Sequence, residues 1–574
     1  MKLITLLLSL TVSTALSLKA QVSCLCPASP TNITIIWSKT FDIGANDVIW
    51  DIEPISTDGG TPDDGFVVVG SANMGYPTGM DIHIKRLNTS GNIVWSETID
   101  MDHNVDAAYA VEQTSNAQLI IAGSSKTDLY PSFLGDKNRN AWLTRMNLNG
   151  TTVSGWPKEF GSTGDDVAYD LKEAESGNIV IAGQAGVSGD DVPSGTQGGA
   201  GDYWVFKTNA SGTIISGRNK VYHGSNTTYE QDYARSVVVD CVTGEYIVTG
   251  FCKSCYPVDF DFSALYMLKI PVNFGTPTEE EVYGYEGERD DFGSYNVIQA
   301  HEVFETCSST SGFLSLGLQH PDGSYGCFGG QHDFWTVLTD NNLAPNDFTL
   351  ACENSDYGSA FGGKKKDNGH SAVQICDGFL LTGLTKSNNK DLSCTLCQVT
   401  CNHYECTPAP ETEDIWIAKI DYGTGELAWN ESIGGTGNDG AYSLKRLPDG
   451  TFVVAGYTTN PLDDSETDWY IVKFEITDCD ERLSQEISGF NVISVYPNPS
   501  FGSFTLSLQT PEKITVDASV EILDLAGKPF YRNEVSIEDG LLQQQISGVT
   551  LSAGFHLVKI VVNGTVYLRP LIIQ

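Results

Sequence analysis

The chain has 574 residues, which is enough for more than one domain with a core of its own. Its 58 glycines, 24 tyrosines and 24 phenylalanines, against six methionines, favour a turn-rich β protein over a helical one. The 73 acidic and 33 basic side chains give a formal charge of −40, which repels phosphate backbones and argues against nucleic-acid binding.

The N-terminus has the layout of a secretory signal peptide. Lys2 precedes an apolar run and small residues that end near Ala20, so residues 1–20 are expected to be removed on export. Cys24 raises the alternative of a lipoprotein, but Gln21 stands where a lipidation motif needs a leucine. No later stretch supplies the roughly 20 apolar residues that span a bilayer, so the sequence predicts no transmembrane segment.

A short strand that ends in glycine recurs along the chain. The copies are FVVVG (66–70), LIIAG (119–123), IVIAG (179–183), YIVTG (246–250), FLSLG (313–317), FLLTG (379–383) and FVVAG (452–456). Their glycines are 53 to 73 residues apart, a period that is typical of solenoids, propellers and other repeat arrays.

Each copy carries other strands in the same order. An alternating strand comes before the glycine-ended strand, and an aromatic-rich strand such as DYWVFK (202–207) comes after it. A fourth strand follows a glycine-containing turn, as in GELAWNESI (425–433). Four short strands joined by turns make one antiparallel sheet, and seven such sheets arranged radially make a β-propeller.

The last copy lacks a fourth strand after DWYIVKFE (468–475), and a matching segment, IIWSKTFD (35–42), lies near the N-terminus. We therefore predict an all-β fold, in which residues 33–478 form a seven-bladed β-propeller closed by the N-terminal strand. A solenoid is the alternative that this displaced strand disfavours. The repeats resemble those of generic secreted bacterial propellers and lack the GH…WD signature of the WD40 type, a resemblance that indicates architecture and not function.

Fourteen cysteines in an exported chain are typical of disulfide bonding. The densest set is Cys394, Cys397, Cys401 and Cys406, with His403 among them. We interpret this set as a disulfide cluster that holds a long insertion together. Thiolates and imidazole at such spacing also suit a tetrahedral zinc ion, which remains the alternative.

An aspartate precedes the first strand of every copy. The set is Asp47, Asp106, Asp166, Asp232, Asp291, Asp367 and Asp439. We expect no cofactor, but in a propeller these carboxylates would surround one end of the axis, where they could hold Ca²⁺. The preferred interpretation is structural, because an aspartate at a turn accepts backbone N–H bonds from that turn. A second set, Asp81, Asp202, Asp333, Asp414 and Asp468, heads the third strands and is also read as structural.

No established catalytic motif is present. The sequence has no GxSxG, no HExxH and no P-loop, and its nine histidines are scattered. The loops after the glycine-ended strands break the repeat and are the expected binding regions. Aromatic residues in them, such as Tyr325, Phe328 and Tyr404, suit stacking on sugar rings. A carboxylate pair of a glycosidase could lie among the many acids, but the sequence singles out none.

A polar segment at 479–490, read as a linker, precedes NVISVYPNPSFGSFTLSL (491–508). The pattern rests on Tyr496, Pro497, Asn498, Pro499, Gly502 and Phe504, with Gly527 in a middle turn and Gly554 before a closing hairpin. It resembles the type A C-terminal sorting domain of type IX secretion system cargo, exported across the outer membrane of Bacteroidota. Alternation in FTLSL (504–508) and HLVKIVV (556–562) predicts a small C-terminal β-sandwich over 491–574.

The resemblance implies that the type IX secretion machinery is a partner and that the mature protein is released or attached at the cell surface. With no catalytic motif, we expect an exported propeller that binds a glycan or a surface protein. A polysaccharide-acting hydrolase or lyase on the same scaffold and a structural adhesion component are the alternatives.

Overall fold

The chain divides into two compact units, residues 1–373 with 380–475 and residues 476–574 with 374–379, and each is described by itself. The computed structural model describes residues 32–57, 64–75, 79–100, 105–126, 139–196, 201–223, 231–240, 243–253, 255, 263–283, 298–306, 312–319, 333–345, 359–362, 365–375, 378–386, 412–421, 427–459, 466–476, 492–496, 504–509, 516–523, 528–537, 541–546, 554–562 and 565–573.

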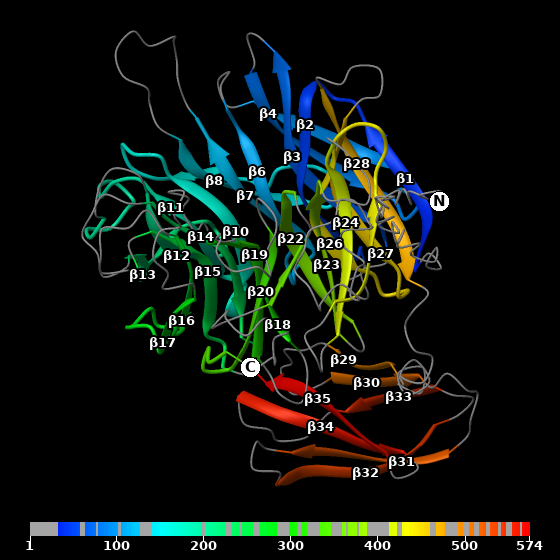
Figure 1. The fold of residues 1–574 in the computed structure, drawn as a ribbon. Helices are drawn as coiled ribbons and strands as arrows, with labels where there is room; N and C mark the ends of the chain where they lie inside the picture. The colour runs from blue at the N-terminus through cyan, green and yellow to red at the C-terminus, as the bar shows by residue number, and fades with distance from the viewer. Residues whose placement is uncertain are drawn as a thin grey trace, which may run out of the picture. The chain divides into compact units, whose positions relative to one another are not determined.

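The first unit is built from four-stranded antiparallel sheets, numbered here in chain order (Figure 1). Sheet 1 contains β2 (Ala45–Pro54), β3 (Phe66–Gly75), β4 (Gly79–Leu87) and β5 (Ile93–Ile99). Sheet 2 contains β6 (Ala107–Gln113), β7 (Gln118–Ser125), β8 (Asn140–Asn147) and β9 (Lys158–Phe160). Sheet 3 contains β10 (Val167–Glu173), β11 (Ile179–Ala185), β12 (Asp202–Thr208) and β13 (Ile214–Tyr222), with a 3-10 turn at Glu175–Gly177.

The remaining sheets of this unit follow the same order. Sheet 4 contains β14 (Asp232–Val239), β15 (Tyr246–Cys252), β16 (Ala264–Ile270) and β17 (Glu279–Tyr283). Sheet 5 contains β18 (Ile298–Thr306), β19 (Gly312–Gln319), β20 (Asp333–Asp340) and β21 (Ser359–Phe361). Sheet 6 contains β22 (Asp367–Ile375), β23 (Gly378–Thr385), β24 (Asp414–Asp421) and β25 (Leu427–Ile433). Sheet 7 contains β26 (Asp439–Arg446), β27 (Phe452–Thr459), β28 (Thr467–Ile476) and, beside β28, the N-terminal β1 (Ile33–Phe41) (Figure 1).

The middle strands of each sheet are mostly buried on both faces, because neighbouring sheets pack against them. Every residue of β11 and β12 is buried. One apolar cluster joins sheets 2 and 3 and contains Ile120, Leu143, Ile181 and Trp204. Another joins sheets 1 and 7, where Ile49 and Phe66 pack with Val453 and Trp469. Burial on both faces explains why these strands read as continuous apolar runs rather than as strict alternation.

The recurring glycine, which was expected to end each second strand, lies inside it, because the strand continues for two or more residues, and its presence there has a steric cause. A Cβ on Gly250 would lie 1.8 Å from the carbonyl oxygen of Tyr233 in the first strand and 2.9 Å from the ring of Tyr203 in the preceding sheet. At Gly70 the same two contacts come from the carbonyl of Val48 at 2.0 Å and from Trp469 at 3.0 Å. The backbone of the first strand therefore approaches so closely that no side chain fits.

The second unit consists of two antiparallel sheets that share one apolar core. Its first sheet contains β29 (Val492–Tyr496), β30 (Phe504–Gln509) and β33 (Leu541–Ile546). The second contains β32 (Pro529–Ile537), β31 (Val516–Leu523), β34 (Gly554–Val562) and β35 (Thr565–Ile573). Phe504 and Leu542 from one sheet belong to the same buried cluster as Val520 and Ile560 from the other. This arrangement agrees with the predicted sandwich.

Among the residues that the structure describes, no helix has the length and apolar character needed to cross a bilayer.

Candidate functional site

The first strands of six of the seven sheets carry a β-bulge at the same place. The register shifts lie at Trp50, Tyr109, Tyr169, Arg235, His301 and Tyr442. In β22 the carbonyl oxygen of Asn368 would lie 1.8 Å from a Cβ on Gly383, as the carbonyl oxygen of Tyr233 would from a Cβ on Gly250. Arg235 stands two residues after Tyr233, so His370, two residues after Asn368, is its equivalent. We call these seven residues the bulge ring, since a bulge redirects the side chain of the extra residue.

Side chains of the bulge ring contact one another from sheet to sheet. The ring centroids of Trp50 and Tyr109 are 5.6 Å apart, and those of Tyr109 and Tyr169 are 5.5 Å apart. Cζ of Arg235 lies 4.1 Å from the centre of the Tyr169 ring, a cation–π contact.

The contacts continue through the last three sheets. His301 and His370 stack with centroids 4.6 Å apart and an interplanar angle of 6°. Tyr442 lies 4.5 Å from His370 on one side and 4.5 Å from Trp50 on the other. All seven side chains are partly buried, so water still reaches them.

Both histidines of the bulge ring are neutral at physiological pH. Burial, with the nearby Arg235 charge, lowers the pKa of His301 to about 4. Burial and the neighbouring His301 lower the pKa of His370 well below its ordinary value. Nδ1 of His301 lies 2.7 Å from the carbonyl oxygen of Gly369 and therefore donates to it. Nε2 of His370 is buried and has no hydrogen-bond partner among the described residues.

In every sheet but sheet 3, the N–H two residues after the bulge-ring residue donates to the side chain that directly follows the bulge-ring residue of a neighbouring sheet. Val111 donates its N–H to Asp51 Oδ2 at 3.0 Å, and Val237 donates to Asp170 Oδ2 at 2.9 Å. The same link is made by Val303 to Ser236 at 3.3 Å, Ala372 to Glu302 at 2.8 Å, Leu444 to Ser371 at 3.1 Å and Ile52 to Ser443 at 3.4 Å. A bulge leaves a backbone N–H without its ladder partner, and the neighbouring sheet supplies the acceptor.

Charged side chains gather beside these links. We call Asp51, Glu53, Glu112, Asp170, Lys172, Glu302 and Lys445 the charged cluster. Lys172 Nζ lies 3.3 Å from Glu112 Oε2, and Lys445 Nζ lies 3.7 Å from Asp51 Oδ1. The two lysine side chains are 33% and 25% exposed, so water reaches both.

Two carboxyls of the charged cluster have strongly raised pKa values. Burial raises the pKa of Glu53 and of Glu302 to about 7, and the Lys445 charge opposes the shift in both. Burial alone would lower the pKa of Lys172, but the carboxylates around it, Glu112 foremost, outweigh burial and raise it. Glu302 accepts the N–H of Ala372, whereas Glu53 has no hydrogen bond within the described residues.

The predicted aspartate set lies where the first strands begin, and its described members are buried. Oδ1 of Asp106, Asp166 and Asp232 accepts the N–H of Lys126, Gly186 and Lys253 at 2.9, 2.9 and 2.8 Å. Asp439 accepts the N–H of Gly435 at 2.7 Å, and Asp367 accepts the hydroxyl of Thr385. These bonds lie within single sheets and favour the structural interpretation, while the calcium ring stays a prediction.

In sheet 5 an isoleucine occupies the place that an aspartate of this set holds in the other sheets. Ile298 pairs with Gln319, as Asp232 pairs with Cys252 in sheet 4, so Ile298 occupies the equivalent position. Asp291 precedes it by seven residues and lies outside the described residues.

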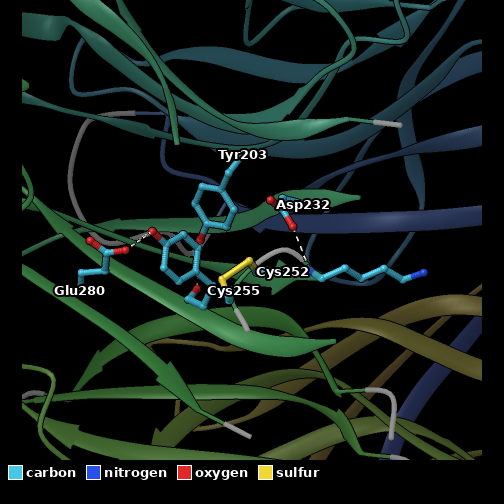
Figure 2. The surroundings of a disulfide bond; sticks show 7 residues. Tyr203, Asp232, Cys252, Cys255 and Glu280 are labelled. Carbon is cyan, nitrogen blue, oxygen red and sulfur yellow. Dashed lines mark hydrogen bonds between the residues drawn. A yellow bond between two sulfur atoms is a disulfide. The ribbon is translucent and has the colours of Figure 1, made fainter. Parts of the chain in front are cut away.

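The predicted cysteine cluster, Cys394, Cys397, Cys401 and Cys406, lies outside the described residues, as do Tyr325, Phe328 and Tyr404. A disulfide joins Cys252, the last residue of β15, to Cys255 and lies near Asp232 and Tyr203 (Figure 2). Sequence reasoning did not single out this pair, although the C-x-x-C spacing directly after a glycine-ended strand was visible.

The bulge ring was also missed from the sequence. Six of its members stand three residues after an aspartate of the predicted set, and all seven are aromatic, histidine or arginine. The offset of three residues can be read from the sequence. The type of a single residue within a strand, however, does not reveal that the strand has a bulge there.

In the sorting pattern, Tyr496 ends β29, Phe504 begins β30 and is 2% exposed, and Gly554 begins β34. Pro497, Asn498, Pro499, Gly502 and Gly527 lie outside the described residues.

Residues 494–574 match the family model of the secretion system C-terminal sorting domain. The chain is therefore type IX secretion cargo, exported to the cell surface or the medium. No curated protein sequence matches the chain at a significant level.

Similar solved structures include a fungal alcohol oxidase in complex with copper, at 10% identity and a TM-score of 0.42, covering 95% of this chain and 100% of that one. An α-L-arabinofuranosidase of Fusarium graminearum shares 7% identity at a TM-score of 0.34, with 64% and 92% covered. A Trypanosoma rangeli sialidase mutant shares 10% identity at 0.29, with 93% and 88% covered. Similarities at such scores carry no information on what this chain does.

Proposed function

We propose that residues 33–478 form a seven-bladed β-propeller, closed by the N-terminal strand, that binds a glycan outside the cell without cleaving it. In this proposal residues 479–490 are a linker and residues 491–574 are the sorting domain that directs export. A protein ligand and a purely structural role in adhesion are the outcomes that the experiment below separates from glycan binding.

The closed circle is supported by contacts between the first and last sheets. β1 is hydrogen-bonded beside β28, in sheet 7. Tyr442 of sheet 7 contacts Trp50 of sheet 1, and Ser443 Oγ donates to Asp51 Oδ1 at 2.8 Å. These contacts between sheets 7 and 1 support a circle of sheets that closes on itself.

The observation that carries the binding proposal is the bulge ring beside the charged cluster. Sugar rings stack on aromatic faces and take hydrogen bonds from charged and polar groups, and both kinds of group are reached by water here. Most carboxylates of the cluster are already engaged. Asp51, Asp170 and Glu302 accept backbone N–H groups of the next sheet, and Glu112 pairs with Lys172.

These bonds favour binding over hydrolysis. A glycosidase needs two carboxyls that are free to act on one bond, and Glu53 is the one carboxyl of the charged cluster without a hydrogen bond in the described structure. The observation that keeps a hydrolase as second candidate is the pKa of about 7 of both Glu53 and Glu302, which suits a general acid.

The test uses the full exported chain on a glycan array, followed by titration calorimetry and a polysaccharide-degradation assay with the best ligand. We expect saturable binding without release of reducing ends. Trp50→Leu should weaken binding at least about tenfold, as expected for loss of one stacked aromatic face. Tyr222→Leu, which removes a partly buried aromatic residue on β13, is the matched control and should bind like the wild type.

Turnover of a bound glycan would favour the hydrolase instead. Absence of glycan binding, together with capture of a surface protein that Trp50→Leu weakens, would redirect the proposal to a protein ligand. Binding that is insensitive to Trp50→Leu would remove the bulge ring from the site.

A further inference from the structure

Three aspartates meet where sheet 7 faces sheet 1. Asp42 lies between β1 and β2, Asp47 lies in β2 and Asp468 lies in β28, and one oxygen of each is within 4.8 Å of the others. We call them the acidic trio. Asp47 is fully buried and Asp468 is 6% exposed, whereas Asp42 is exposed. The trio thus joins the last sheet, the first sheet and the segment between them.

At two other sheet junctions, a glycine stands at the position that Asp42 occupies between sheets 7 and 1. Five residues before Asp166 and before Asp439 the chain has glycine, at Gly161 and Gly434, where Asp42 stands before Asp47. A Cβ on Gly161 would lie 2.6 Å from Asn140 Oδ1 and 2.7 Å from Asp166 Oδ2.

At Gly434 a Cβ would lie 2.0 Å from Asp414 Oδ1 and 2.9 Å from Asp439 Oδ2. Two polar side chains therefore converge on the glycine at both junctions, without room for a third. The junction of sheets 7 and 1 adds a third carboxylate at that place.

Asp47 also lacks a bond that its counterparts have. Oδ1 of Asp106, Asp166 and Asp232 accepts an N–H from the residue three positions after the recurring glycine. In sheet 1 that residue is Asn73, which pairs with Ala45 in the β2–β3 ladder.

Oδ2 of Asp47 accepts the N–H groups of Ile43 and Gly44, at 2.8 and 2.9 Å. Oδ1 of this fully buried residue has no hydrogen-bond partner among the described residues. A buried oxygen of a carboxylate that is left without a donor is costly unless a cation completes it.

We propose that the acidic trio binds one Ca²⁺ ion. The site offers hard oxygen ligands from three carboxylates, one of them with an unpartnered buried oxygen, and Ca²⁺ accepts such irregular oxygen sets with waters in its remaining positions. A bound ion would tie β28 to the segment that connects β1 and β2. The proposal differs from the predicted sevenfold aspartate ring, of which only Asp47 is a member, and it is independent of glycan binding.

The experiment compares three forms of the full exported chain, stripped of metal with EDTA and titrated with CaCl₂ by calorimetry and thermal denaturation. The wild type should bind one Ca²⁺ per chain, and saturating CaCl₂ should raise its Tm by about 3 °C or more. Asp42→Asn should abolish both effects and leave the Tm in EDTA unchanged within about 2 °C, because Asp42 is exposed. Asp414→Asn, at the junction of sheets 6 and 7, is the matched control and should keep the calcium response.

No calcium effect on the wild type would overturn the proposal. Equal loss in Asp42→Asn and Asp414→Asn would show that the calcium response is not specific to the acidic trio, and binding of several ions per chain would show that other carboxylates bind the ion; either result would overturn the proposal. A Tm rise of the same size with MgCl₂ in place of CaCl₂ would overturn the assignment to calcium.

Discussion

Glu53 shows how a single residue of the charged cluster responds to its surroundings. Its carboxyl is buried among two lysines and other carboxyls, and burial raises its pKa to about 7. Because the folded pKa lies above the ordinary value of a glutamate, the contribution of this group to stability is complete at low pH. It is lost as pH rises from about 4.5 to about 7.

Glu53→Gln removes that titration. We expect the free energy of unfolding of the variant, relative to the wild type, to increase from pH 5 to pH 8. A shift of this size corresponds to about 3 kcal/mol at full strength, and because water reaches the cluster we expect about 1–2 kcal/mol. Glu302, His301 and His370 titrate in both proteins and largely cancel in the difference. Urea denaturation at each pH measures it.

The control for this experiment is Glu475→Gln, which changes an exposed glutamate in β28. Between pH 5 and pH 8, the free energy of unfolding of Glu475→Gln relative to the wild type should change by less than half of the change seen for Glu53→Gln. A profile for Glu53→Gln that is flat between pH 5 and pH 8 would show that the carboxyl does not titrate in this range.

At the scale of residues, the sequence predicts the positions of the aspartates but not their partners. The offset of three residues from aspartate to bulge is regular, yet nothing local distinguishes Trp50 or His370 from an ordinary strand residue. Their contacts depend on neighbouring sheets that are tens of residues away in the chain, which a local pattern does not encode.

At the scale of elements, the recurring glycine and the bulge are two sides of one arrangement. The bulge moves a carbonyl of the first strand towards the second strand, and glycine gives it room. The sequence predicts the strands with the recurring glycine and their order well, because apolar runs and turn residues are local signals. It does not predict the bulges. Since both faces of the neighbouring strand are buried, a shift in register does not change the pattern of apolar and polar residues in the sequence.

Gly183→Ala tests this arrangement. The added Cβ would lie 2.0 Å from the carbonyl oxygen of Val167, so β10 must move away from β11. We expect a loss of about 2–3 kcal/mol in the free energy of unfolding, typical of overpacking against backbone. Chemical denaturation followed by tryptophan fluorescence measures the loss.

Gly435→Ala is the matched control. Gly435 is exposed, and the nearest atom to a Cβ added there would be Asp439 Oδ2 at 3.9 Å, so its substitution should change stability by less than about 0.5 kcal/mol. If Gly183→Ala is as stable as the wild type, β10 can move to accommodate the added Cβ without loss of stability, and the glycine has another role.

At the scale of the whole molecule, the sorting domain determines where the protein goes. Residues 494–574 match the sorting family, and Phe504 and Gly554 of the predicted pattern begin strands of the sandwich. The resemblance was visible in the sequence because its turn residues are contiguous. The identity of the ligand could not be read from the sequence, because the expected binding loops and the bulge ring depend on residues that only folding brings together.

Removal of residues 491–574 should block export without unfolding the rest of the chain. We expect the truncated protein to accumulate inside the producing cell, with the full chain at the surface or in the medium, as measured by fractionation and immunoblotting. Arg532→Ala, an exposed change on β32 of the same domain, should be exported normally. Efficient export of the truncated chain would assign the sorting signal to another segment.

The links after the bulges have a mechanical consequence for the proposed circle. Sheet 2 has Ala110 where the others have an acid or a serine, and Leu171 of sheet 3 donates its N–H to Asp170 of its own strand, at 2.8 Å. The joint at which the two ends of the chain meet keeps its link, through Ser443 and Ile52. In the proposed circle, the junction of the two chain ends is therefore held by this link as well as by β1, while sheets 2 and 3, which an uninterrupted stretch of chain connects, are linked through Glu112, which accepts the N–H of Glu173 and pairs with Lys172.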